Sequence, residues 1–344
     1  RERFTRHGLV AVRVGSPASG DRIRFTRGGR EVLAGDRVHY RRLWSETGWR
    51  MRALRDDPVA ARQEFDTLLD VSDPGLSVRI PFETPPMIRT GARPEVLILR
   101  EQGVNGHVEM AAAFHAAGFT AVDATMTDLA RERTDLTRFQ GLAACGGFSY
   151  GDVLGAGQGW ARSILFNDRL KERFTEFFQR ADTFALGVCN GCQMLSALAE
   201  LIPGAQGWPR FVRNKSHRFE ARLVSVEIAP SPSVLLAGMA GARLLVPCAH
   251  GEGMATLLPR AEGQIALRYV DNRGHTTENY PANPNGSPGG VAGVTSLDGR
   301  VTIMMPHPER VFRWVQHSWI PEGQQGDGPW LRMFANARSW LDGA

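Results

Sequence analysis

One cysteine lies where an apolar strand pattern meets a helix pattern. Residues 184–188 are FALGV and residues 190–195 are NGCQML, so Cys189 stands at the junction, with Gly187 two residues before it and Gly191 two residues after it. A nucleophile raised on a sharp strand-to-helix turn has a strained backbone, and the residues on either side crowd together and must be small. The amino end of the following helix favours the thiolate, which attacks carbonyl carbons. The spacing therefore predicts a nucleophilic cysteine.

A second segment supplies the other groups that acyl transfer needs, a base and a group that orients it. Residues 301–305 (VTIMM) predict a buried strand, which runs directly into PHPER at 306–310. His307 and Glu309 therefore follow the carboxyl end of a strand, the edge of an α/β sheet where catalytic groups gather. We expect Cys189 and His307 to meet there, with Glu309 beside the histidine.

A glycine-rich segment, CGGFSYGD at 145–152, follows the apolar run GLAA at 141–144. Backbone amides in such a loop can face a developing oxyanion. One donor is usually the amide just after the nucleophile, here Asn190, and the other comes from a neighbouring strand-to-helix loop. We expect Gly147 to be the second donor.

Each of these patterns also has a plainer interpretation. Cys189 and Cys192 form a CxxC pair, which fits a redox pair or half of a zinc site. A zinc site would need two more ligands, and Cys145 and Cys248 provide no second CxxC, so we predict no metal site. Taken alone, 145–152 could be a simple turn and His307 a packing or capping histidine. Among the histidines weighed for the base, only His307 combines a strand end with an adjacent carboxylate.

Several segments resemble the glutaminase domain of the phosphoribosylformylglycinamidine synthase family. The resemblance runs from about Arg93 to the carboxyl end. The segments that carry it are REQGVNGHVEMAAAF at 100–114, GGFSYGD, GVCNGCQ, AHGEG at 249–253, YPANPNGSPGG at 280–290 and MMPHPERVFR. The resemblance implies a class I glutamine amidotransferase, in which the cysteine attacks the side-chain amide of glutamine, releases ammonia and is freed by water.

The resemblance also implies roles for individual residues. Cys189 matches the nucleophile of the family, His307 its base and Glu309 the partner of the histidine. The substrate-binding residues that we expect are Gly147, Asn190, Gln193 and His250. Of these, Gln193 is four residues after the nucleophile, a position that contacts the substrate in related glutaminases, and His250 belongs to AHGEG.

In this family ammonia is channelled to an ATP-dependent synthetase, which converts formylglycinamide ribonucleotide to the amidine in purine synthesis. The chain begins with Arg1 and contains no glycine-rich phosphate loop with a lysine. We therefore expect it to be the carboxyl-terminal piece of a longer polypeptide, with no cofactor of its own and with ATP and Mg²⁺ in the missing synthetase region. The expected partners are glutamine and the missing synthetase domains.

The periodicity predicts an α/β fold for residues 95–344. Strand patterns at 95–99, 119–122 and 141–144 alternate with a helix pattern at 108–117, which favours a parallel sheet covered on both faces. Residues 219–228 alternate like an antiparallel strand, and a last helix is expected at 328–341. We predict a mixed, mostly parallel sheet sandwiched by helices, as in the flavodoxin-like class I amidotransferases.

The preceding residues predict a separate part. We expect residues 1–72 to be a partial α+β tail of a truncated synthetase domain, and residues 73–94 to be a linker that contains Thr84-Pro85-Pro86. Within the tail we expect a strand at 9–14, a hairpin through 27–30 and two helices. The first helix pattern, at 43–55, resembles the end of a synthetase repeat of the family.

Composition narrows the class of protein. The chain has 344 residues, 42% of them hydrophobic and 22% charged, which is ordinary for a soluble globular protein. No apolar run approaches membrane-spanning length and no signal peptide opens the chain, so no membrane partner is expected. Four cysteines without a paired framework indicate a reducing, cytoplasmic location.

The net charge of +5 is concentrated at the amino end, where residues 1–55 hold 14 arginines against 5 acidic residues. Such a patch suits nucleic acid or a phosphorylated substrate, or it is a solvated or interdomain face. Aromatic residues are weakly interleaved with the arginines, so we favour the second interpretation and expect no nucleic acid. Two other functions stay open: another cysteine hydrolase on the same fold, such as an amidase or peptidase, and a non-catalytic regulatory module.

Overall fold

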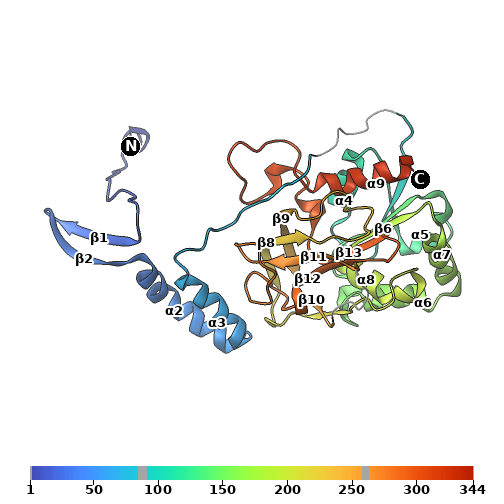
Figure 1. The fold of residues 1–344 in the computed structure, drawn as a ribbon, viewed down its shortest axis with the longest axis horizontal. Helices are drawn as coiled ribbons and strands as arrows, with labels where there is room; N and C mark the ends of the chain where they lie inside the picture. Colours follow the sequence, from blue (N-terminus) through green and yellow to red (C-terminus); the bar gives the residue numbers. More distant parts are fainter. Residues whose placement is uncertain (1, 84–90, 258–262, 344) are drawn as a thin grey trace.

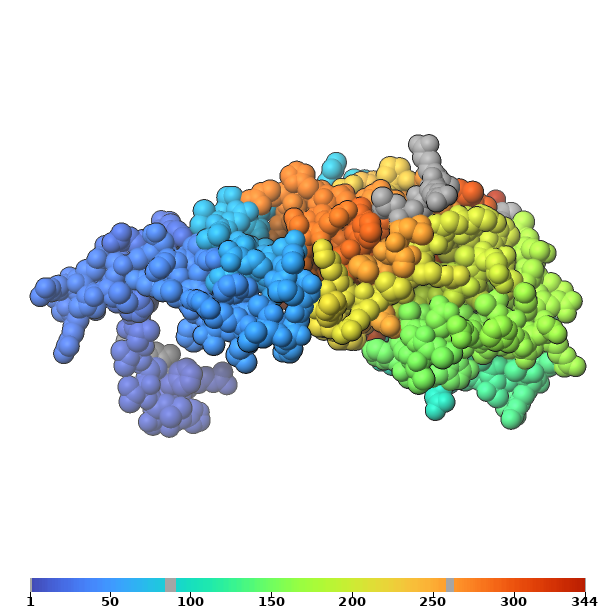
Figure 2. All heavy atoms as spheres, turned by 90° about the horizontal axis from the view of Figure 1, so that it is seen from below, coloured from blue at the N-terminus to red at the C-terminus, as the bar shows by residue number. Residues whose placement is uncertain are grey.

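The computed structural model describes residues 2–83, 91–257 and 263–343. An amino-terminal segment lies beside a larger α/β body in Figure 1, and it projects from one end of that body in Figure 2. After a short helix, α1 (Glu2–Thr5), the segment contains the hairpin β1 (Arg22–Arg27) and β2 (Arg30–Asp36) and the helices α2 (Arg37–Arg55) and α3 (Pro58–Asp66).

The body is built on one sheet, which has nine strands within the described residues, in the order β4-β3-β5-β6-β13-β12-β11-β8-β9. The strands are β3 (Glu95–Arg100), β4 (Thr120–Thr125), β5 (Gly141–Ala144), β6 (Phe184–Val188), β8 (Glu220–Ile228), β9 (Arg243–His250), β11 (Ile265–Val270), β12 (Val291–Thr295) and β13 (Val301–Met304). A second, small sheet pairs β7 (Phe211–Arg213) with β10 (Glu252–Ala255).

The sheet is mixed, as predicted, but its antiparallel part is larger than expected. Neighbouring strands are parallel from β4 to β13 and antiparallel from β13 to β9. Parallel neighbours need a long crossover, usually a helix. The described residues between β8 and β13 contain no α-helix, so these strands pair antiparallel instead. The strands joined by helices therefore pair in parallel, and the strands joined by segments without an α-helix pair antiparallel.

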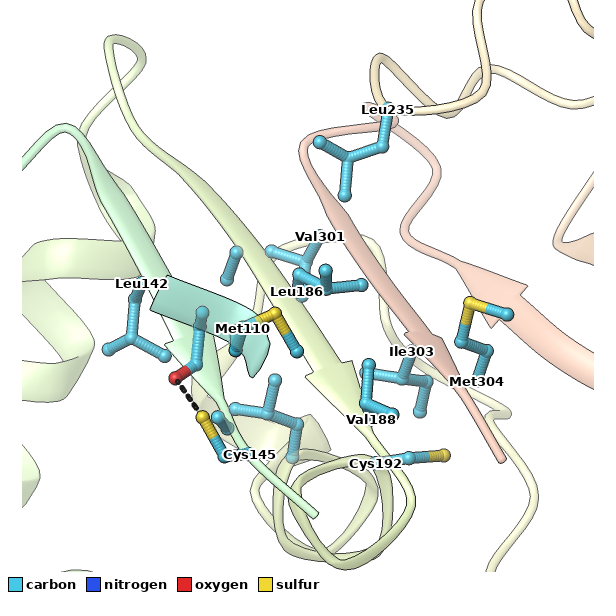
Figure 3. Close-up of a cluster of buried hydrophobic side chains, with 14 of the residues drawn as sticks. Met110, Leu142, Cys145, Leu186, Val188, Cys192, Leu235, Val301, Ile303 and Met304 are labelled. Carbon is cyan, nitrogen blue, oxygen red and sulfur yellow. Dashed lines mark hydrogen bonds between the residues drawn. The ribbon is translucent and has the colours of Figure 1, made fainter. Parts of the chain in front are cut away.

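Helices cover the parallel half of the sheet. They are α4 (His107–Ala116), α5 (Met126–Ala130), α6 (Gln158–Leu165), α7 (Asp168–Gln179), α8 (Asn190–Ala197) and α9 (Leu331–Gly343). Helix α4 packs with α9, and α6 packs with α7 and α8. Strand β6 is buried along its whole length, as expected when both faces of a parallel strand are covered. Figure 3 shows Leu186 and Val188 of β6 beside Ile303 of β13 in this core.

Most of the predicted elements form close to the expected positions. Strand β5 has the predicted bounds, β8 is antiparallel and the predicted hairpin is β1–β2. Helix α2 begins at Arg37, six residues before the predicted start. The strand predicted at 9–14 is wrong, because this segment joins no sheet and Val10, Val12 and Val14 are exposed. An alternating pattern makes a strand only where a neighbouring strand pairs with it.

The amino-terminal segment contacts the body through a few polar groups. Asp56 pairs with Arg218 at 3.3 Å. The Gln63 side chain donates to Asn279 at 3.1 Å and accepts from the Tyr280 backbone at 3.0 Å. The division into 1–72, 73–94 and 95–344 stays a prediction, and Thr84-Pro85-Pro86 of the predicted linker lie outside the described residues. Among the described helices, none combines the length and the apolar character that a membrane span requires.

Candidate active site

The turn between β6 and α8 has the geometry that its two glycines predict. Cys189 has φ 53° and ψ −109°, in a region that residues other than glycine rarely occupy. A Cβ on Gly187 would lie 2.8 Å from the Gly191 carbonyl oxygen. A Cβ on Gly191 would lie only 1.9 Å from the Ala144 carbonyl oxygen. Neither position has room for a side chain, so the cysteine is raised on a turn that requires glycine on both sides.

His307 reaches Cys189 because their strands are neighbours. Strands β6 and β13 are parallel, with Val188 opposite Met304, so both chains leave the sheet at the same edge. Gly146 lies against both side chains: a Cβ there would be 2.6 Å from His307 Cε1 and 3.3 Å from Cys189 Cβ. Cys189 and His307 therefore lie together, as expected, and both pack against Gly146.

Glu309 holds the histidine from the other side. His307 Nδ1 lies 2.6 Å from Glu309 Oε1, and both side chains are buried. The carboxylate fixes the proton on Nδ1 and leaves Nε2 for chemistry. His307 Nε2 has no hydrogen-bond partner among the described residues. This nitrogen is therefore free to exchange a proton with the Cys189 thiol or with a substrate. The three groups thus have the order of a nucleophile, a base and an orienting carboxylate.

The charges of this site favour a reactive thiolate. Burial opposes ionisation of Cys189, but the positive charge of His307 outweighs it and lowers the thiol pKa to about 6. Burial also opposes the charged form of His307, but the charges of Glu309 and Cys189 raise its pKa to about 9. Between these two values the pair is a thiolate and an imidazolium.

The other cysteines lack this activation. All four cysteines are free and buried. Burial raises the pKa of Cys145 and of Cys192 well above the ordinary value, and it raises the pKa of Cys248 to about 12. Cys192 packs under the strand ends in the hydrophobic cluster of Figure 3. The two cysteines of the CxxC pair therefore have opposite properties, and only Cys189 has the properties of a nucleophile.

The expected oxyanion donors lie beside the cysteine. Gly147 has φ 149°, and a Cβ there would lie 2.4 Å from Val104 Cα, so the loop backbone packs too closely for a side chain. No backbone hydrogen bond of the described residues outside helices and strands uses the Gly147 N–H. Asn190 is the first residue of α8, and an N–H in the first turn of a helix has no intrahelical acceptor. Both amides are thus available to an oxyanion.

The side chains of Asn190 and Gln193 connect the loops around the site. Asn190 accepts from the Ser149 N–H and donates to Asp152 and to Gln193, each at 3.0 Å. Gln193 donates to the Glu252 carbonyl oxygen at 2.5 Å. Both amides are buried. These bonds tie the 145–152 loop, α8 and the 249–253 turn into one frame.

His250 also lies at the site. It ends β9, and the carbonyl oxygen of the preceding residue, Ala249, lies 3.8 Å from Cys189 Sγ. His250 Nε2 bonds Asn285 Oδ1 at 2.7 Å. His250 Nδ1 is buried and has no other partner among the described residues. Every predicted site residue is therefore found at one edge of the sheet.

Three residues at the site were not predicted. Gly146 packs against both the cysteine and the histidine, and its signals in the sequence were the doubled glycine in CGGF and its place in GGFSYGD. Asp152 is half-buried, and burial raises its pKa to about 6; the sequence placed it at the end of GGFSYGD, but no role was predicted for it. Asn285 belongs to the 280–290 segment that carries the resemblance, but only the folded chain reveals its contact with His250.

Comparison with known proteins shows the family of the chain and its fold. Residues 93–341 match the family described as CobB/CobQ-like glutamine amidotransferase domain. The chain belongs to this amidotransferase family. Among solved structures, PurLQS from Thermotoga maritima aligns over 73% of this chain and 100% of its own, with 22% identity and a TM-score of 0.55, and so shares the fold.

A second solved structure matches less well. It is a glutamine amidotransferase from Thermotoga maritima, which aligns over 64% of this chain and 77% of its own, with 18% identity and a TM-score of 0.40. The family match and the fold shared with PurLQS confirm the amidotransferase fold predicted from the sequence. The roles of the individual site residues stay predictions. Within the described residues, no group of three or more histidine, cysteine or acidic side chains is arranged to hold a metal ion.

Proposed function

We propose that this chain is the glutaminase portion of a phosphoribosylformylglycinamidine synthase. The family match and the fold shared with PurLQS support this function, together with the motifs that resemble those of the synthase family. The observation that carries the proposal is the buried arrangement at the ends of β6 and β13, where Cys189 stands on a strained turn beside His307 and Glu309 Oε1 lies 2.6 Å from His307 Nδ1. The lowered pKa of Cys189 and the raised pKa of His307 favour a thiolate and an imidazolium there. A ready thiolate at a turn is what amide hydrolysis through a thioester needs.

In the proposed reaction the Cys189 thiolate attacks the side-chain carbonyl carbon of glutamine. The amides of Gly147 and Asn190 stabilise the oxyanion. His307 gives its proton to the departing nitrogen, so that the C–N bond breaks, ammonia leaves and a glutamyl thioester forms. The neutral His307 then takes a proton from water, the hydroxide displaces the sulfur, and glutamate and the thiolate are restored.

The ammonia serves a second reaction outside this chain. We propose that it is channelled to a synthetase that uses ATP and Mg²⁺ to convert formylglycinamide ribonucleotide to the amidine. The synthetase, on the same longer polypeptide, is then a partner of this amidotransferase. We place the reaction in the cytoplasm, where four free cysteines stay reduced.

The test compares two nitrogen sources in the complete enzyme that contains this chain. Cys189→Ala should abolish synthesis of the amidine from glutamine, because no thioester can form. Synthesis from added ammonia should stay near the wild-type rate, because it bypasses the cysteine. Equal loss with both nitrogen sources would contradict the assignment, and cleavage of peptides by the wild type would favour another cysteine hydrolase.

A further inference from the structure

We propose that His250 and the Ala249 carbonyl oxygen form a pair of hydrogen-bond acceptors that binds the side-chain NH2 group of glutamine and selects it over glutamate. This inference rests on the proposed function and adds a specificity determinant to it. The proposed mechanism gives His250 no step, although its ring is buried beside the reacting sulfur.

The place of this pair is set by strand β9. The strand ends at His250, and its last residues lie along the site. The Pro247 carbonyl oxygen accepts from the His307 N–H at 2.9 Å, and the Ala249 carbonyl oxygen lies 3.8 Å from Cys189 Sγ. Once the cysteine is a thiolate it has no proton to donate to Ala249. The carbonyl oxygen is then free to accept from a substrate.

The orientation of Asn285 fixes the proton of His250. The Asn285 Nδ2 group donates to the Gly253 carbonyl oxygen at 2.8 Å and to Tyr269 Oη at 2.9 Å. A carbonyl oxygen only accepts, so the NH2 end of the amide must face Gly253 and the oxygen end must face His250. Because Asn285 Oδ1 also only accepts, the proton of the neutral imidazole lies on Nε2. Nδ1 is then a bare acceptor.

The ring cannot turn away from this orientation. A Cβ on Gly253 would lie 2.5 Å from both Cδ2 and Nε2 of His250, so only glycine leaves room for the ring there. Asn214 holds the same turn by donating to the His250 carbonyl oxygen at 2.8 Å and accepting from the Gly253 N–H at 2.9 Å. Buried amides that fix a histidine whose second nitrogen has no other partner indicate that this nitrogen meets a ligand.

His250 Nδ1 and the Ala249 carbonyl oxygen are two acceptors beside Cys189 that match the side-chain NH2 group of glutamine. The NH2 group of a carboxamide has two N–H donors, and one can point to each acceptor. The carboxylate of glutamate offers only acceptors at the same place, so it leaves both partners unsatisfied and is repelled. His307 cannot fill this role, because its imidazolium is a donor. The pair therefore favours binding of the substrate and release of the product.

The test measures how glutamine and glutamate protect Cys189 from alkylation by iodoacetamide in the full chain. The wild type should be protected by glutamine at far lower concentrations than by glutamate. In His250→Leu this preference should fall about tenfold or more, since one buried acceptor is lost. His275→Leu is the matched control: His275 is exposed, and its loss should leave the preference unchanged.

A second variant keeps the test decisive if His250→Leu does not fold. Asn285→Asp has nearly the same shape. It loses the bond to the Gly253 carbonyl oxygen but places a carboxylate at Nε2, which favours the imidazolium and turns Nδ1 into a donor. Glutamate should then protect better than in the wild type, an effect that a purely structural role would not produce. An unchanged preference in both variants would overturn the inference. A wild-type thiol that glutamine does not protect would instead overturn the proposed function.

Discussion

At the scale of single residues, the chemistry depends on one sulfur atom between two histidines of different character. Glu309 makes His307 a cation, whereas Asn285 gives His250 a neutral partner. The sequence predicted the pairing of His307 with Glu309, because the two residues are two positions apart in one motif. It could not predict the contact of His250 with Asn285, because these residues are 35 positions apart and nothing in their two motifs pairs them.

The charge of His307 should set the titration of the thiol. Below a pH of about 6 Cys189 carries its proton, and above it the thiolate forms, so the alkylation rate should rise with pH around that value. In His307→Asn the cation is lost while burial remains. The midpoint should then move above about 8.5, the ordinary thiol value. The measurement is the rate of iodoacetamide labelling against pH.

The matched control for this change is His275→Asn, which alters an exposed histidine. Its titration midpoint should equal that of the wild type. A midpoint near 6 that persists in His307→Asn would show that another group activates the thiol.

At the scale of elements, the site depends on the adjacency of β6 and β13. The apolar runs predicted both strands within one residue, because buried parallel strands are continuous in hydrophobicity. The number of antiparallel neighbours was not predictable, since the pairing of β11, β8 and β9 is decided by contacts distant in sequence. The false strand at 9–14 has the same cause: local alternation does not specify a partner.

The elbow should tolerate no side chain at Gly191. A Cβ there would lie 1.9 Å from a backbone oxygen of β5, so α8 and the sheet would have to separate. We expect Gly191→Ala to destabilise the protein by about 2–3 kcal/mol and to lower the reactivity of Cys189. Thermal or denaturant unfolding measures the first effect.

The control is Gly48→Ala, also in a helix, where a Cβ would meet nothing within 4 Å. That change should be neutral or stabilising by up to about 1 kcal/mol, because alanine is the better helix former. If Gly191→Ala and Gly48→Ala had the same free energy of unfolding, close packing would not explain the glycine at position 191.

At the scale of the whole molecule, the chain consists of an amidotransferase body and an amino-terminal segment with little core of its own. Trp49 stacks on Phe65 at 4.6 Å between α2 and α3. Trp44 and Leu54 on α2 are about nine-tenths exposed. Exposed apolar side chains are expected where a partial domain lacks the part that covers it, and the assignment of residues 1–72 as such a tail stays a prediction. Many of the arginines pair locally, as Arg52 does with Glu64.

This arrangement predicts that the body folds by itself. A shortened chain of residues 77–344 keeps the whole nine-stranded sheet and the Arg79 backbone pairing with Arg243. It loses polar contacts with the body that are made by Asp56, Asp57, Gln63, Glu64, Asp70, Ser72 and Asp73. Its melting temperature should lie within a few degrees of that of the full chain, since surface ion pairs contribute about 0–1 kcal/mol. Non-cooperative unfolding of the shortened chain would contradict the predicted domain boundary.

The most direct test of the account is to label the full chain near neutral pH with an electrophile that mimics glutamine and to map the modified cysteine. We expect modification at Cys189, slowed by prior addition of glutamine, and none at the other three cysteines, whose pKa values are raised by burial. Modification at Cys145, Cys192 or Cys248 instead, or labelling of Cys189 that glutamine does not slow, would contradict it.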